Sequence, residues 1–199
     1  MKNALAIAAL VAASLACTGC TVEKTHDANG AEHVKIATPF GGLKVRAKDS
    51  AATAADIGLP QYPGAVPVKD GDKGGSANVD MGFGNFRMTI KVASFATDDP
   101  QDKIVAFYKK ALATYGDVII CEKKQAIGKP DRTSEGLTCQ DSDHGHAEDV
   151  NIDDGITVKA GSKHHQRLVA VENESAAGKR TKFAMVELEL PNTDDKQNQ

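Results

Sequence analysis

Residues 79–92 read VDMGFGNFRMTIKV. Apolar and polar side chains alternate on both sides of Gly84-Asn85, and a glycine in the first position of a two-residue loop suits a type II′ turn. The pattern predicts an antiparallel hairpin in which Phe83 pairs with Phe86 on the apolar face. We expect that face to be buried and the other face to meet water, as is common in antiparallel sheets. The side chains predicted to face water are those of Arg87, Thr89 and Lys91.

One amphipathic helix is predicted after this hairpin, over about residues 100–115. Asp99 suits the N-cap, Pro100 suits the first helical position, and Gly116 ends the helix. Apolar side chains recur at helical spacing along the segment, as in the pair Ile104 and Tyr108. This spacing predicts an apolar stripe that packs on one face of the sheet.

Further strands are predicted from short apolar or alternating runs, over residues 33–38, 43–47, 118–121, 137–139, 156–160, 168–172 and 183–190. A short helix is predicted over residues 50–57, where Gly58 supplies a left-handed end. In the last strand, Glu187 and Glu189 alternate with apolar residues, so both carboxylates are expected to face solvent. Many strands and one main helix indicate the α+β class, with the helix packed on one face of an antiparallel sheet.

The first twenty residues predict a signal peptide. Lys2 is followed by an uncharged run, Ala4–Ala16, which is too short to span a bilayer but long enough for a signal h-region. The stretch SLACTGC, residues 14–20, resembles a bacterial lipobox, in which a cysteine after small residues becomes the lipidated first residue. Cys20 and Cys17 both fit, so the lipidated residue stays open between them. A cleaved secretory signal without lipid is the alternative.

The leader predicts an extracytoplasmic protein anchored to a membrane through N-terminal lipid, in the periplasm or at the outer membrane, with secretion as the alternative. The chain divides into a signal peptide (1–20), a flexible tether (21–31), one α+β domain (32–191) and a disordered polar tail (192–199). The formal net charge is −3. Nucleic acid is not expected as a partner, because its binders show clustered basic surface.

Two cysteines lie in the body of the chain, Cys121 in VIIC and Cys139 in GLTC. In an oxidising compartment such a pair usually forms a disulfide. The disulfide would close a loop whose chain entropy corresponds to about 3 kcal/mol. The alternative is two buried free thiols.

A segment rich in imidazole and carboxylate groups lies between residues 141 and 154, and such groups bind transition metals. Its weak metal-ligand candidates are His144, His146, Asp143 and Asp149. The run from His144 resembles the metallo-β-lactamase pattern His-x-His-x-Asp-His, but Asp149 stands where the last histidine belongs. We therefore favour a solvated acidic loop and predict no metal site and no cofactor. His164-His165 is predicted to be a surface pair.

Three short stretches form a layout: LPQYPGA at 59–65, FATDD at 95–99, and Val105 with FYK at 107–109. The layout resembles one found in uncharacterised exported bacterial proteins, over roughly residues 55–190. This resemblance implies an extracytoplasmic domain of unassigned role, and it carries no catalytic residues to transfer.

No serine-hydrolase elbow, Ser-x-x-Lys or His-Glu-x-x-His motif occurs in the sequence. The sequence therefore favours a non-enzymatic cell-envelope lipoprotein that serves as a binding or interaction module, with an envelope protein or a small ligand as partner. The alternative is a metal-binding protein or metal-dependent hydrolase that uses the loop of His144 and His146.

Overall fold

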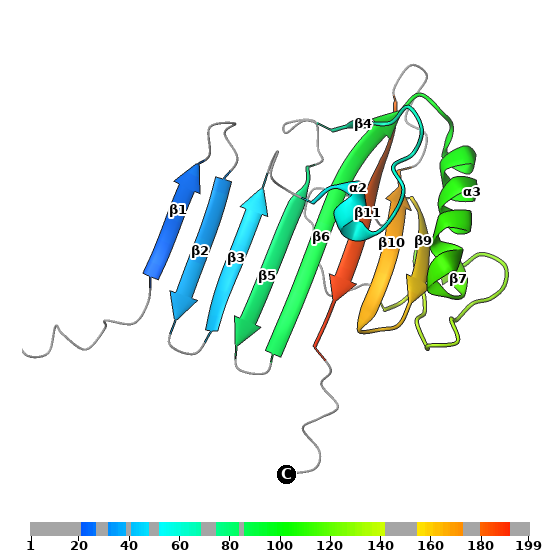
Figure 1. Ribbon diagram of the computed structural model, residues 1–199. Helices are drawn as coiled ribbons and strands as arrows, with labels where there is room; N and C mark the ends of the chain where they lie inside the picture. Colours follow the sequence, from blue (N-terminus) through cyan, green and yellow to red (C-terminus); the bar gives the residue numbers. More distant parts are fainter. Residues whose placement is uncertain are drawn as a thin grey trace, which may run out of the picture.

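The computed structural model describes residues 21–26, 32–38, 41–47, 52–68, 75–83, 86–141, 155–172 and 180–191. Within these ranges, eleven strands form one sheet in which every pairing is antiparallel (Figure 1). The strands are β1 (Thr21–His26), β2 (Glu32–Thr38), β3 (Gly41–Ala47), β4 (Val66–Pro67), β5 (Ala77–Phe83), β6 (Phe86–Thr97), β7 (Val118–Glu122), β8 (Gln125–Ala126), β9 (Ile156–Gly161), β10 (His165–Val171) and β11 (Thr181–Glu189). The helical elements are α2 (Ala54–Ile57), α3 (Gln101–Leu112) and the 3-10 turn η2 (Ala113–Tyr115). The order across the sheet is β1-β2-β3-β5-β6-β11-β10-β9-β7-β8, and β4 pairs with β6.

The prediction of an antiparallel sheet with one main helix is confirmed, although strands dominate the described chain more than the α+β class implies. The register of the hairpin that decides the fold is also confirmed, because β5 and β6 pair with Phe83 opposite Phe86. The expected burial of its apolar face is wrong near the turn, where Phe86 is 40% exposed. The turn residues of the hairpin, 84–85, lie outside the described ranges, as do the predicted signal peptide with Cys17 and Cys20 and the tail over 192–199.

Two segments differ from the prediction. The sequence predicts a flexible tether over residues 21–31, but Thr21–His26 forms β1, which pairs along its whole length with β2. The sequence also predicts a strand over residues 137–139, where the structure has only isolated bridges. Leu137 lies between the bridge residues Gly136 and Thr138, and its backbone N–H donates to the hydroxyl of Thr133 at 2.9 Å instead of to a neighbouring strand.

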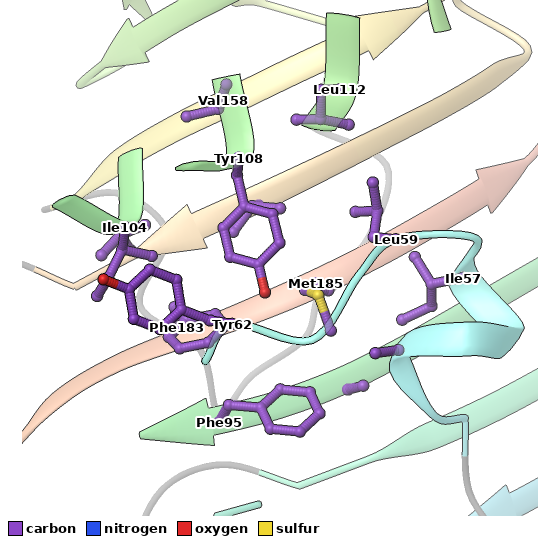
Figure 2. Packing of buried hydrophobic residues seen from close by; sticks show 14 of the residues in the cluster. Ile57, Leu59, Tyr62, Phe95, Ile104, Tyr108, Leu112, Val158, Phe183 and Met185 are labelled. Carbon is purple, nitrogen blue, oxygen red and sulfur yellow. The ribbon is translucent and has the colours of Figure 1, made fainter. Parts of the chain in front are cut away.

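The largest buried cluster joins side chains of α2, α3 and residues 59–65 to side chains of β6, β9, β10 and β11 (Figure 2). Tyr62 lies inside this cluster, with its ring centroid 5.1 Å from that of Phe107 and 6.2 Å from that of Phe183. From α3, Tyr108 is fully buried and its ring centroid lies 5.5 Å from that of Phe183. Each large side chain buried in this way stabilises the fold by about 1.5–3 kcal/mol.

The start of α3 differs from the prediction by one residue. Its N-cap is Pro100, and no side chain makes the capping hydrogen bond. The Asp99 carboxylate is engaged elsewhere, since one oxygen accepts from the Tyr62 hydroxyl at 3.0 Å and the other from Lys103 Nζ at 2.8 Å. The hydrogen bonds from Lys103 and Tyr62 lower the pKa of Asp99. Asp99 therefore ties the helix to the segment that holds Tyr62.

A second cluster surrounds the disulfide that the sequence predicts. Cys121 of β7 is bonded to Cys139, and the two Cα atoms lie 5.6 Å apart. Both cysteines are buried with Leu137. Successive side chains of a strand point to opposite faces, and on β7 Ile120 packs against the main core while Cys121 belongs to the second cluster. The disulfide therefore fixes residues 132–141 to β7 away from the main core.

We predict that the double substitution Cys121→Ala and Cys139→Ala lowers the free energy of unfolding by about 3 kcal/mol, because the disulfide closes a loop with a sequence separation of 18. Urea denaturation under non-reducing conditions measures the difference. The unsubstituted protein with added reductant is the control and should lose a similar amount. Equal stability of the variant and the oxidised protein would contradict the prediction.

Candidate functional site

Three charged side chains lie in register across the middle of the sheet, on β6, β11 and β10. Lys91 is opposite Glu187, and Glu187 is opposite Arg167. Glu187 is only 3% exposed. Its Oε2 accepts from Lys91 Nζ at 2.7 Å, while its Oε1 accepts from Arg167 Nη2 and lies 3.4 Å from His165 Nε2. We call Lys91, Glu187 and Arg167 the charged row.

The charged row keeps its carboxylate ionised inside the protein. Burial by itself would raise the pKa of Glu187, but hydrogen bonds from Lys91 and His165 and the charge of Arg167 outweigh it and lower the pKa. In return, the hydrogen bond to Glu187 raises the pKa of Lys91. A buried charge is tolerated when it is paired and hydrogen-bonded in this way.

The same cations hold the end of α2. Lys91 Nζ and Arg167 Nε donate to the backbone carbonyls of residues 56 and 57, at 3.1 and 2.8 Å. The hydroxyl of Tyr115 donates to the next carbonyl, that of Gly58. The Arg167 guanidinium also lies 4.2 Å from the centroid of the Tyr115 ring. Cations suit this position, because the last carbonyls of a helix carry partial negative charge.

The position of Glu187 corrects the sequence prediction, which places this carboxylate and that of Glu189 in solvent. Glu189 has a side-chain exposure of 51%, but Glu187 is buried. The prediction is wrong for Glu187 because β11 is a central strand with both faces covered, so alternation along the strand does not mark a solvent face. Lys91, also expected in solvent, points to the same covered face as Glu187.

His165, Glu187 and Glu189 come within metal-ligand distance of one another, with one ligand atom from each lying within 4.8 Å of the others. Both oxygens of Glu187 already accept hydrogen bonds from Lys91 and Arg167. A metal ion there would face two positive charges at close range. The arrangement therefore suits an internal ion-pair network better than a metal centre.

The metal-ligand candidates from the sequence, His144, His146, Asp143 and Asp149, lie outside the described residues. His164-His165, predicted to be a surface pair, lies at the start of β10. The Nδ1 atom of His164 is 3.1 Å from the carbonyl oxygen of Pro191, and His165 has a side-chain exposure of 49%.

The part of the sheet formed by β1, β2, β3 and β5 differs from the rest, and we call it the bare half. None of the side chains that the structure describes in these four strands is buried. Apolar side chains form one row across them and onto β6, in the order Val22, Ile36, Leu43, Met81 and Met88. The half of the sheet toward β9 holds the three buried clusters, whereas the described side chains of the bare half keep contact with solvent.

A shallow groove of about 500 Å³ lies over the bare half and the start of β6. Parts of two register rows line it, on the face opposite the side chains of Ile36 and Leu43, and these rows continue onto β1 at Glu23 and Thr21. One row is Lys35, Lys44, Asp80 and Thr89, and the other is Ala37, Gly42, Gly82 and Arg87. The two glycines leave the floor of the groove without side chains.

The rim of the groove carries three cations and one carboxylate. Thr89 donates a hydrogen bond to Asp80 at 3.3 Å. In the part of the chain that the structure describes, Lys35, Lys44 and Arg87 take part in no ion pair. Cations beside an open floor are chemically suited to bind an anionic group.

Sequence reasoning missed this groove, although one signal pointed to it. Glycine inside a strand often marks a place where a ligand or another backbone approaches closely, and Gly42 and Gly82 are such residues. The missing information was the register, which alone sets Gly42 opposite Gly82 and Lys35 opposite Lys44.

Comparison with known proteins matches the chain to no family model, no curated protein and no solved structure. Among the described residues, no helix combines the length and hydropathy needed to cross a bilayer.

We predict that Glu187→Gln lowers the free energy of unfolding by about 2–4 kcal/mol at neutral pH, because Lys91 and Arg167 lose their counter-charge while keeping some contact with water. Urea denaturation measures the loss, and hydrogen exchange at residues 56–58 should rise as α2 loosens. Glu189→Gln is the matched control, since the same change at an exposed position should have little effect.

The loss of stability caused by Glu187→Gln should depend on pH. Because the pKa of Glu187 is lowered in the folded protein, its charge stabilises the fold above the ordinary value of 4.5 and that stability is lost as the pH falls through the folded pKa. The stability difference between the unsubstituted protein and Glu187→Gln should therefore shrink at acid pH. If the stability difference between the two proteins stays constant from neutral to acid pH, it does not come from the ion pairs of Glu187.

Proposed function

We propose that this protein is an exported, lipid-anchored, non-enzymatic binding module of the cell envelope. In this proposal the acyl chains attach at Cys20 or Cys17, and the module binds another envelope component through the bare half of its sheet. The covered half, with α3 over one face, serves as the stable platform. The observation that carries the proposal is that four consecutive strands in the described protein bury none of their described side chains.

Three further observations support it. The disulfide between Cys121 and Cys139 suits an oxidising compartment outside the cytoplasm. The buried carboxylate of Glu187, which would otherwise suit acid–base chemistry, is held between two cations and serves the fold. The groove presents Lys35, Lys44 and Arg87 beside a floor without side chains, which fits recognition of a partner.

Processing is tested by the intact mass of the mature protein purified from membranes of the native host. We expect a chain that begins at Cys20 or Cys17, carries acyl chains and lacks the two hydrogens lost on forming the disulfide. Substituting both Cys17 and Cys20 by Ser should release the protein from the membrane fraction. A chain that still begins at Met1 and fractionates with cytosolic proteins would overturn the proposal.

Binding is tested by placing a photo-crosslinking residue at one position in living cells. At Val34, in the bare half but outside the groove, we expect one reproducible adduct with an identifiable envelope component. At Lys109, an exposed lysine of α3, the same residue should give no such adduct. Absence of an adduct at Val34, or the same adduct at both positions, would contradict binding through the bare half.

A further inference from the structure

The N-terminal end of β1 and the floor of the groove lie in a single row of the sheet. Thr21 pairs with Ala37, Ala37 with Gly42, Gly42 with Gly82, and Gly82 with Arg87. The row therefore crosses five strands, a span of about 19 Å at about 4.8 Å per strand. The chain therefore enters the sheet, at Thr21, at the same end of the sheet as the groove.

This placement matters if Cys20 or Cys17 carries lipid, as the proposed function holds. Cys20 is the residue before Thr21, and Cys17 is only four residues before it. Because β1 begins at Thr21, no long tether can separate the sheet from the lipid. The end of the bare half that carries the groove must then lie close to the membrane surface.

The same end of the sheet presents exposed apolar side chains on its other face. Val22 is 69% exposed and Phe86 is 40% exposed. Phe86 comes directly before Arg87 at the start of β6, so the two side chains point to opposite faces. An aromatic side chain beside a cation is the combination that suits the boundary between lipid headgroups and acyl chains.

The charges of the groove complement phosphate. Lys35, Lys44 and Arg87 give its lining three positive charges against the single carboxylate of Asp80. Like charges directly opposite each other on neighbouring strands are unfavourable. Lys35 stands directly opposite Lys44, although Glu23 lies opposite Lys35 on β1 and Asp80 lies opposite Lys44 on β5. A phosphate between the two lysines would relieve this repulsion, and the Arg87 guanidinium offers a planar fork that matches phosphate oxygens.

We propose that the end of the bare half that carries the groove contacts the membrane that holds the lipid anchor. Lys35, Lys44 and Arg87 bind phosphates of the lipid headgroups, and Phe86 enters the boundary with the acyl chains. The strands then rise from the membrane, with β1 entering the sheet at the membrane side. This inference rests on the proposed function, because the anchor supplies the proximity.

The test uses the acylated full protein purified from membranes and inserted into vesicles. The sequence contains no tryptophan, so Phe86→Trp introduces a unique fluorescent reporter. In vesicles of phosphatidylglycerol with brominated acyl chains, we expect its emission to shift to shorter wavelength and to be quenched. Ile127→Trp is the matched control, because Ile127 is 45% exposed and lies next to β8, at the other edge of the sheet from β1. Its emission should not change.

The phosphate contacts are tested in the Phe86→Trp background. Lys44→Gln and Arg87→Gln should each lower the ratio of quenched to unquenched tryptophan about fivefold, and Lys109→Gln should leave it unchanged. Gly82→Val should also reduce quenching, because it fills the groove, and the nearest atom to an added Cβ is the Phe86 carbonyl oxygen at 3.8 Å. Urea denaturation of each variant confirms that it is folded.

The outcomes separate this inference from the proposed function. Acylated protein whose tryptophan at position 86 is unquenched, or is quenched no more than the one at position 127, overturns the inference and leaves the lipoprotein standing. Protein whose intact mass shows no acyl chain overturns the proposed function. If inorganic pyrophosphate binds the unquenched protein and Arg87→Gln abolishes that binding, the groove takes free phosphate and the membrane assignment is wrong.

Discussion

The buried carboxylate of Glu187 constrains the strands and the helix around it. An ionised carboxylate inside a protein is costly unless cations and hydrogen bonds surround it, and Lys91 and Arg167 provide both from the neighbouring strands. Because the two cations also bind the last carbonyls of α2, the same charges that neutralise Glu187 position the short helix. The end of the main core, the three central strands and α2 therefore depend on one another.

The sheet is asymmetric along its length, and this asymmetry connects the fold to the proposed role. From β6 toward β9, side chains of the sheet pack against α2, α3 and the disulfide-bonded segment. They form buried clusters that stabilise the protein. From β1 to β5, the described side chains keep contact with solvent. In the proposed role, the stable half supports the half that binds. The strand register brings Gly42, Gly82 and Arg87 to the end of the sheet where β1 begins.

Three stretches of the sequence, residues 59–65, 95–99 and 105–109, meet in the core. Tyr62 contacts Phe107 and bonds Asp99, while Phe95 stacks on Phe183 with ring centroids 5.7 Å apart. Each of the three stretches thus contributes to the same packing unit. Their pattern in the sequence reflects how the segment of residues 59–65 and α3 are held together.

The sequence by itself determined the features that depend on neighbours along the chain. The hairpin register follows from alternation around Gly84-Asn85, and the end of α2 follows from Gly58, whose φ of 78° suits glycine. The pairing of Cys121 with Cys139 follows from their being the only cysteines in the body of the chain. Tertiary structure alone decided the burial of Glu187, the strand β1 and the groove. Alternation says that two faces of a strand differ, but which face is covered, and which distant residues share a row, depends on strand order and register across the whole sheet.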